Sequence, residues 1–239
     1  MSSVELLCFD LDDTLWAAGP VLLRAEEIQY AWLTTHLPRV AAAHDIGAMQ
    51  ARRRALMRER PDLAHDFTAL RRAAMAELCD ACGYDPALGD AAVEVFLEAR
   101  SAVTLFEEVD EVLRDLRRNY RLASLTNGNT DLVRAGVAQY FDYMLSPVDT
   151  GCSKPDPRMF KAVMARAGVA ASAMVHIGDE PRHDIEGALR AQVRAVWLNR
   201  DGRAWPEGQR RADAEIGSLR ELRAVLERLQ DTKEEIPKA

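Results

Sequence analysis

The chain has 239 residues, of which 48% are hydrophobic and 29% are charged, and its formal net charge is −7. This composition is typical of a globular protein with room for one main core and a smaller second one. The acidic balance argues against broad contact with nucleic acid or anionic lipid, since both need a basic surface. We therefore expect no nucleic-acid or membrane partner, and an anionic small ligand must be attracted by local charge.

The first residues show no basic segment followed by an apolar stretch, and no run of about 18 apolar residues occurs anywhere in the chain. We therefore expect a cytosolic protein. The four cysteines are Cys8, Cys152 and a C-x-x-C pair at Cys79 and Cys82. A zinc site would need a second ligand pair at matching spacing, so we expect reduced, structural thiols.

Short, nearly continuous apolar runs predict buried parallel strands. They are Val4 to Phe9, Leu122 to Thr126, Met174 to Ile177 and Ala195 to Leu198, with Tyr143 to Leu145 as an additional short strand. Amphipathic spacing predicts helices between them, one with Val109, Val112, Leu113 and Leu116 on its apolar face and one following Pro157. Strands that alternate with helices predict an α/β fold with a doubly wound parallel sheet.

The stretch from Pro20 to Val103 is different, because it lacks a strand pattern and is rich in Ala, Arg, Leu and Glu. Breaks near Pro38, Pro61 and Gly83–Pro86 divide it into about four predicted helices. We interpret it as an inserted helical domain over 18–103, with 1–17 and 104–239 forming the main domain. The tail from Asp231 to Ala239 is expected to fray.

Polar residues gather at the predicted strand ends, where ligands bind in open α/β sheets. They are Asp10, Asp12, Asp13 and Thr14 after the first strand, Thr126 and Asn127 after the second, Gly178, Asp179 and Asp184 further on, and Lys154 in a loop. Several carboxylates in one cleft raise one another's pKa unless a cation is present. Mg²⁺ suits such oxygen ligands and offsets repulsion between an anionic nucleophile and a phosphate.

Four segments resemble, in order, the four motifs of the haloacid dehalogenase superfamily. They are Asp10–Leu15, Leu125–Gly128, Lys154–Pro155 and Gly178–Asp184. The resemblance covers nearly the whole chain and implies a Rossmann-like core with an α-helical cap inserted directly after the first motif. It also implies Mg²⁺ as the cofactor.

The resemblance further implies a two-step mechanism. Asp10 attacks phosphorus to form an aspartyl-phosphate, and Asp12 acts as general acid and then as general base. Thr126 and Lys154 hold the phosphate oxygens with help from Asn127. Mg²⁺ is bound by Asp10, the carbonyl of Asp12 and Asp179, and Asp184 bonds to a metal-bound water or to Lys154.

Each motif residue also has a purely structural explanation. Asp13 and Thr14 can cap the next helix, Lys154 can be a solvated charge, Thr126 can be an ordinary strand residue, and Asp184 can be a favourable acid in a first helical turn. Together these explanations require four independent coincidences at strand ends. The ordered set therefore favours a functional site.

The superfamily includes dehalogenases, phosphonatases, mutases and phosphatases. A dehalogenase attacks carbon and has no use for Asp12 or for a metal, and phosphonatases typically have a small residue at the second position. Asp12 therefore favours a phosphatase acting on a small phosphate monoester. A sugar phosphomutase and a non-catalytic domain that binds a phosphometabolite stay open.

Further segments resemble superfamily members that act on FMN and on the phosphorylated ribitylaminouracil of riboflavin synthesis. They are Phe9–Leu15, Pro20–Arg24, His65–Thr68, Leu125–Asn129 and Ser153–Pro155. Candidates for the leaving-group pocket are His65, Asp66, Arg71, Arg72 and Trp16. Alternatively, His65 and Asp66 cap a helix over Phe67–Cys82, Arg71 and Arg72 form a solvated face, and Trp16 packs the cap on the core. We expect His176 to have a structural role and His183 to lie at the rim of the pocket. We expect the protein to be a monomer or a homodimer.

Overall fold

Six strands form one parallel sheet in the computed structural model, which describes residues 4–231. They are β1 (Leu6–Phe9), β2 (Arg121–Leu125), β3 (Tyr143–Leu145), β4 (Met174–Gly178), β5 (Arg194–Leu198) and β6 (Ala214–Ile216). Their order is β3-β2-β1-β4-β5-β6, and every neighbouring pair is parallel. The predicted doubly wound α/β sheet is confirmed. The short strand β6 was missed, because its central residue Glu215 is exposed and interrupts any apolar run.

The chain divides into two compact units. The first, the sheet unit, contains the described residues up to Trp16, then Leu105–Asn127 and the described residues from Ala138 onward. The second, the helical unit, contains Ala17–Thr104 and Gly128–Val137. We expected 128–137 in the main domain, but hydrogen bonds attach this segment to helices of the helical unit. Asn129 Nδ2 donates to Thr68 Oγ1 at 3.1 Å, and the Asp131 N–H donates to Ser101 Oγ at 3.1 Å.

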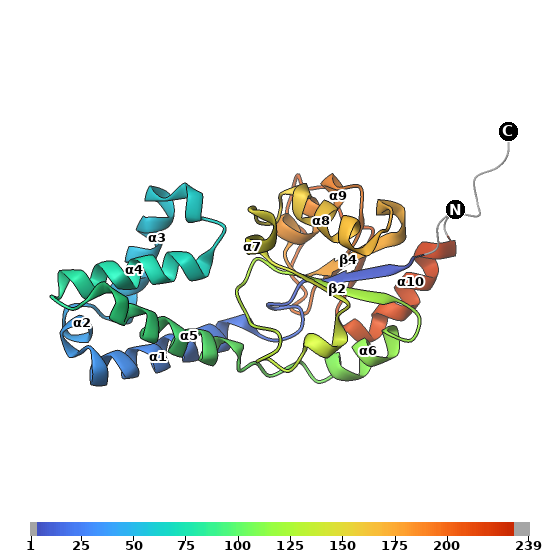
Figure 1. The fold of residues 1–239 in the computed structure, drawn as a ribbon. Helices are drawn as coiled ribbons and strands as arrows, with labels where there is room; N and C mark the ends of the chain where they lie inside the picture. The colour runs from blue at the N-terminus through green and yellow to red at the C-terminus, as the bar shows by residue number, and fades with distance from the viewer. Residues whose placement is uncertain (1–3, 232–239) are drawn as a thin grey trace. The chain divides into compact units, whose positions relative to one another are not determined.

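Helices cover both faces of the sheet, with α8 and α9 on one face and α6 and α10 on the other (Figure 1). Their bounds are α6 (Val109–Leu116), α8 (Pro157–Ala167), α9 (Gly187–Arg190) and α10 (Leu222–Asp231), with a shorter helix α7 (Pro147–Thr150). Both predicted helices, α6 and α8, are therefore confirmed. Short helical turns are η3 (Ala138–Tyr140), η4 (Ala171–Ala173), η5 (Pro181–Glu186) and η6 (Leu219–Glu221). Part of the predicted fraying tail, 232–239, lies outside the described residues.

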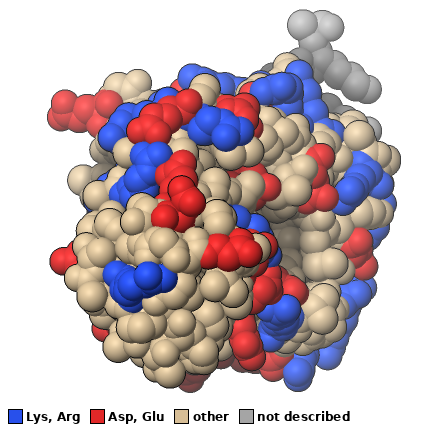
Figure 2. Space-filling view, turned by 60° about the vertical axis from the view of Figure 1, so that its left-hand side comes forward, with Lys and Arg blue, Asp and Glu red and all other residues tan. Residues whose placement is uncertain are grey.

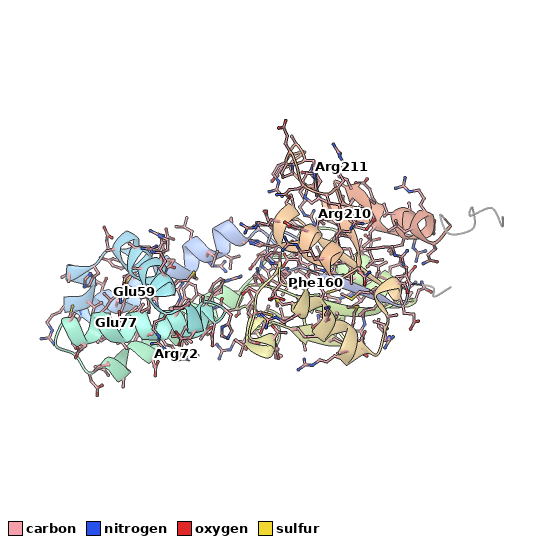
Figure 3. The ribbon with its side chains drawn as sticks, turned by 90° about the horizontal axis from the view of Figure 1, so that it is seen from above. Glu59, Arg72, Glu77, Phe160, Arg210 and Arg211 are labelled. Carbon is pink, nitrogen blue, oxygen red and sulfur yellow. The ribbon has the colours of Figure 1, made fainter. Side chains whose placement is uncertain are left out.

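The core of the sheet unit lies between the sheet and the helices on each face. Leu6, Cys8 and Ala195 of the strands are fully buried in one cluster with Phe160 of α8. Phe160, labelled in Figure 3, also packs edge-on against the ring of His176 at a centroid distance of 5.0 Å. Burial of each large apolar side chain stabilises the fold by about 1.5–3 kcal/mol. The strand ends are thereby held by a packed, rigid scaffold.

The helical unit contains α1 (Ala18–His36), α2 (Pro38–Ala43), α3 (Ile46–Glu59), α4 (Phe67–Ala81) and α5 (Gly89–Ser101), with short turns η1 (Pro61–Leu63) and η2 (Pro86–Leu88). The predicted breaks at Pro38, at Pro61 and before Pro86 are confirmed. The prediction of about four helices missed one break, at Asp45. Its carboxylate accepts a hydrogen bond from the Ala48 N–H at 2.7 Å and starts a new helix, α3.

Apolar side chains hold these helices together, including Leu33, Met75, Leu78 and Val93. Arg52 of α3 adds ion pairs to Glu59 and Glu77, both labelled in Figure 3. Acidic and basic side chains are interspersed on the face of the molecule in Figure 2. All four cysteines, which lie in the described part of the chain, are free thiols. No helix among residues 4–231 has the length and apolarity to span a membrane.

Candidate active site

Asp10 follows β1 directly and is buried, with 6% of its surface exposed. Its N–H donates to the Ile177 carbonyl at 2.9 Å, which fixes the end of β1 against β4. The next residues turn back sharply, because Asp13 adopts a left-handed conformation with φ 59°. This turn brings the Thr14 hydroxyl to Asp10 Oδ2, to which it donates at 3.3 Å. Thr14 therefore orients Asp10. The capping hypothesis for Asp13 and Thr14 is wrong, since α1 begins after Ala17.

Asp12 is held by Trp16. The fully buried indole donates from Nε1 to Asp12 Oδ1 at 2.8 Å. This interaction was not foreseen, because we assigned Trp16 to a leaving-group pocket or to packing between domains. The spacing of Asp12 and Trp16 could have indicated this hydrogen bond, since an aromatic donor four residues after an acid can reach it across a tight turn.

Lys154 lies at the centre of the site and has only 3% of its surface exposed, so the hypothesis of a solvated lysine is wrong. Its Nζ donates to Asp10 Oδ1 at 2.6 Å, to Asp184 Oδ1 at 2.6 Å and to the Leu125 carbonyl at 2.7 Å. These three bonds use all the donors of an ammonium group. Lys154 therefore joins the ends of β1 and β2 to η5.

Asn127 holds the main chain of Lys154. Its side-chain oxygen accepts from the Lys154 N–H at 2.7 Å, and its Nδ2 donates to the Lys154 carbonyl at 3.0 Å. The side chain of Asn127 is thus occupied in positioning the lysine. Thr126, just before it, is buried, and its N–H donates to the Leu145 carbonyl at 3.3 Å.

The charges of Lys154 and Asp184 stabilise each other. Burial disfavours both charged forms, but the two carboxylates beside Lys154 outweigh it and raise the pKa of the lysine. Likewise, Lys154 and a hydrogen bond from His176 outweigh burial and hold the pKa of Asp184 below its ordinary value. Both groups are therefore charged at neutral pH.

His176 belongs to the same network, although we expected only a structural role for it. The ring is fully buried on β4, and Nε2 lies 3.0 Å from Asp184 Oδ1. Burial lowers the pKa of His176, so the ring is neutral. An ionised carboxylate only accepts hydrogen bonds, so Nε2 carries the proton and donates. The isolated histidine in an otherwise apolar strand was the signal in the sequence.

Gly178 makes room for Asp184. A Cβ atom at this position would lie 2.3 Å from Asp184 Cγ, well inside the contact distance. The Asp184 carboxylate also accepts from the Glu180 N–H at 3.0 Å, so it is fixed from a second side. Glycine is thus required here by close approach, whereas the sequence alone showed only the Gly-Asp pair.

Two distant side chains position Asp179. Trp197 Nε1 donates to the Asp179 carbonyl at 2.8 Å, and Arg203 Nη2 donates to the same carbonyl at 2.7 Å. Arg203 also contacts Asp179 Oδ2 at 3.4 Å. Burial, followed by the nearby charges of Asp184 and Asp13, raises the pKa of Asp179 to about 7. Neither partner is recognisable from the sequence alone.

Three carboxylates in the described part of the chain form a group that fits a metal ion. Asp10, Asp179 and Asp184 each offer an oxygen, and these oxygens lie within 4.8 Å of one another. Burial, followed by the charges of Asp184 and Asp179, raises the pKa of Asp10, and Lys154 only partly opposes this. An all-oxygen donor set with excess negative charge suits a hard cation such as Mg²⁺. The Asp12 side chain is not part of the group.

The remaining predicted residues lie in the helical unit or on the surface. Asp66 caps α4 by accepting from the Ala69 N–H at 2.8 Å, which confirms the capping explanation, and His65 precedes it half-buried. Arg72, labelled in Figure 3, is half-buried and pairs with Asp90 and Glu94 of α5. Arg71 is buried and ion-paired, so the hypothesis of a solvated face is wrong for Arg71. His183 is exposed.

Comparison with known families gives a match to the model described as haloacid dehalogenase-like hydrolase, over residues 4–192. This range covers most of the chain and all the strand-end residues described above. The chain belongs to the haloacid dehalogenase-like hydrolase family.

Relatives of this hydrolase differ in the reactions for which they are named. The 5-amino-6-(5-phospho-D-ribitylamino)uracil phosphatase YigB of Escherichia coli is 27% identical over 83% of this chain and 84% of its own length. A phosphoserine phosphatase of Thermus thermophilus is 32% identical over 92% and 98% of the two chains. The crystal structure of a 2-haloacid dehalogenase from Pseudomonas syringae pv. Tomato superposes with a TM-score of 0.89 at 40% identity, covering 94% of this chain and 99% of that one.

Proposed function

We propose that this hydrolase is a Mg²⁺-dependent phosphatase that cleaves a small phosphate monoester through an aspartyl-phosphate on Asp10. The observation that carries the proposal is the buried group at the strand ends, where Lys154 bonds Asp10 and Asp184 while Asp179 adds a third carboxylate. Such a group combines a nucleophile, a fixed positive charge and a set of metal ligands. Asp12, two residues after Asp10, adds an acid.

The residues that would hold Mg²⁺ are Asp10, Asp179 and the backbone carbonyl of Asp12, with Asp184 acting through a water or through Lys154. The fit rests on the oxygens of Asp10, Asp179 and Asp184, which lie within 4.8 Å of one another. When bound, the ion would reduce the repulsion between the anionic phosphate and the anionic nucleophile.

In the first step, a carboxylate oxygen of Asp10 attacks phosphorus in line as the ester P–O bond breaks. The departing oxygen takes a proton from Asp12. Because the Trp16 N–H already donates to Oδ1 of Asp12, the transferable proton sits on Oδ2. In the second step, Asp12 takes a proton from the water that attacks the phosphorus, and Asp10 is regenerated.

Lys154 acts in both steps. Before reaction its Nζ bonds Asp10 Oδ1 at 2.6 Å, which orients the nucleophile. When Asp10 becomes an acyl phosphate it loses its charge, so the ammonium group is drawn to the phosphate oxygens instead. The Asp184 carboxylate, itself held by His176, keeps Lys154 charged throughout. The Thr126 hydroxyl is proposed as a second donor to the phosphate, with the backbone of Asn127 beside it.

For the substrate, FMN or a riboflavin-pathway phosphate is the first choice. Support comes from the segments that resemble such phosphatases and from the similarity to the E. coli enzyme named for the ribitylaminouracil phosphate. Phosphoserine is the next compound to test, because the Thermus relative is named for it. The proposed roles of His65 and Arg71 in binding the leaving group stay predictions.

A second candidate reaction is dehalogenation of a 2-haloacid, favoured by the 40% identity to the protein named as a dehalogenase. Halide leaves carbon as a weak base and needs no proton, so this reaction gives Asp12 no task. The carbon centre is uncharged and does not repel the carboxylate nucleophile, so the reaction needs no metal ion at Asp10, Asp179 and Asp184. The presence of Asp12 and Asp179 therefore supports phosphoryl chemistry.

One assay separates the candidates. Purified protein is incubated with Mg²⁺ and p-nitrophenyl phosphate, FMN, ribitylaminouracil phosphate, phosphoserine, sugar phosphates or nucleotides, and in parallel with chloropropionate. We expect phosphate release that EDTA abolishes, and no chloride release. Chloride release without phosphate release would establish the dehalogenase instead. Isomerised sugar phosphate would indicate a phosphomutase, and binding without turnover a non-catalytic domain.

A further inference from the structure

The helical unit contains a cavity of about 530 Å³, which lies within the range of small-molecule pockets. Its walls come from α1, α3, α4 and α5, with Asn129 from the segment after β2. Much of the lining is apolar, and it includes Leu22, Leu23, Met57, Phe67, Leu70 and Phe96. Leu23 is 59% exposed and Phe67 40% exposed, so the apolar wall is open to a ligand.

The charged part of the lining is strongly basic. Arg53, Arg54 and Arg71 line the cavity, and Glu26 is the one acid among the lining residues, all of which the structure describes. The lining therefore carries two excess positive charges, whereas the whole chain has a net charge of −7. This local reversal of charge is what an anionic ligand requires in an acidic protein.

One carboxylate serves two of these arginines. Glu26 Oε1 accepts from Arg71 Nη2 at 2.9 Å and also from Arg53 Nη2. Arg71 also donates to Gln29 Oε1 at 3.0 Å, and its guanidinium carbon lies 3.2 Å from the centroid of the Phe96 ring. Both guanidinium groups are thereby fixed, and that of Arg71 lies over the ring of Phe96.

Burial makes the shortage of negative charge costly. It lowers the pKa of Arg71 to about 10 and also lowers the pKa of Arg53, but both side chains stay charged at neutral pH. Because Arg53 and Arg71 share the single carboxylate of Glu26, part of the free-energy cost of removing their charges from water is not offset. A second anion would offset it. The helical unit thus presents an incompletely neutralised charge beside an apolar wall.

We propose that this cavity binds an organic anion with an apolar or aromatic body. The body would pack against Phe67 and the leucines of α1, and a carboxylate, phosphate or sulfonate group would pair with Arg53 and Arg54. The inference does not depend on the proposed phosphatase activity, because it rests only on residues of the helical unit.

The competing explanation is that the arginines merely tie α1, α3 and α4 together. Arg54 separates the two explanations, because it lines the cavity and is exposed. Arg58 is its matched control, since it lies on the same helix and is exposed but does not line the cavity. A structural role predicts no difference between these two residues.

The test uses the full chain and two fluorescent probes of similar shape. Anilinonaphthalene sulfonate is an anion with an aromatic body, and phenylnaphthylamine lacks the sulfonate. We expect Arg54→Gln to weaken binding of the anion about tenfold while the neutral probe is unaffected, and Arg58→Gln to change neither. Equal anion affinities for Arg54→Gln and Arg58→Gln, or equal effects on the two probes, would overturn the proposal.

Leu23→Asp provides a second variant at an exposed position of the apolar wall. A charge there should weaken both probes, and unchanged binding of both would contradict the proposed site. A melting temperature and circular dichroism spectrum for each variant exclude unfolding as the cause. Because probe binding needs no turnover, this test can fail or succeed independently of the phosphatase assay.

A further arm identifies the source of the natural anion. If anilinonaphthalene sulfonate raises the KM for the best phosphate ester at constant kcat, the cavity binds the leaving group of the substrate. If the probe instead changes kcat at constant KM, the cavity binds a separate effector. Either result supports the site. Probe binding that does not depend on Arg54 and has no effect on the kinetics would contradict it.

Discussion

The two units of this hydrolase contain charge clusters of opposite sign. In the sheet unit Lys154 pairs with Asp10 and Asp184 beside a third carboxylate, Asp179, whereas in the helical unit three arginines line a cavity with one glutamate. Neither cluster is balanced by its own side chains. Because uncompensated buried charge costs free energy, the sign of each excess supports the ligands proposed above, a cation at the strand ends and an anion in the helical unit.

The largest expected effect is the loss of the nucleophile. Asp10→Asn keeps the shape of the side chain but removes its charge, so kcat with FMN should fall by about 1,000-fold or more. Steady-state phosphate release measures this, and an unchanged melting temperature serves as the control. A variant with full activity would mean that Asp10 is not the nucleophile.

Asp12→Asn should lower kcat by about 100-fold or more for FMN, whose alkoxide leaving group needs a proton. With p-nitrophenyl phosphate kcat should also fall, because the base of the second step is lost. The loss in kcat/KM, which reports the first step, should be much smaller than with FMN, because nitrophenolate leaves without protonation. Comparing the two substrates on the same variant therefore isolates the acid step. Equal losses in kcat/KM with both would assign Asp12 to another role.

Lys154→Met tests the balance of charge in the sheet unit. It leaves Asp10 and Asp184 buried without their cation, so the free energy of unfolding should fall by about 3–5 kcal/mol, and activity should be lost. The exposed Lys161 on α8 offers a matched control, for which we expect a change within about 0.5 kcal/mol. Urea denaturation compares them, and equal stabilities would contradict the proposed charge balance.

Gly178→Ala tests the close approach of Asp184. The added Cβ would meet Asp184 Cγ at 2.3 Å, so we expect a loss of about 1–3 kcal/mol in stability and reduced kcat as Asp184 moves. Gly19→Ala on α1 provides the comparison, because a Cβ atom added there would have no neighbour within 4 Å. A stable, fully active Gly178→Ala variant would show that the site tolerates a shifted Asp184.

The smallest effect is expected in the helical unit. Arg71→Met leaves Glu26 paired with Arg53, so the remaining pair is balanced and stability should fall by only about 1–2 kcal/mol. Arg72→Met removes exposed ion pairs and should cost about 0–1 kcal/mol. If Arg71→Met lowered the free energy of unfolding as much as Lys154→Met, the proposed difference between the two clusters would be wrong.

The sequence predicted most of the sheet because buried strands and motif residues leave local patterns. The aspartates were predicted from their places at strand ends, and Lys154 was predicted from the Lys-Pro motif in a loop. The partners of Asp179 were missed, because Trp197 and Arg203 are far from it in the sequence and meet it only through the parallel order of β4 and β5. Burial of Arg71 was missed for a related reason, since its charge is balanced by Glu26 from another helix.

Detection of the covalent intermediate tests the central claim most directly. Protein mixed with Mg²⁺ and FMN is quenched in acid, digested and analysed by mass spectrometry. We expect the peptide that contains Asp10 to carry one phosphoryl group, and this group to be absent without Mg²⁺ and in Asp10→Asn. Phosphate release with no phosphorylated peptide, or an ester on Asp10 formed only with chloropropionate, would contradict the account.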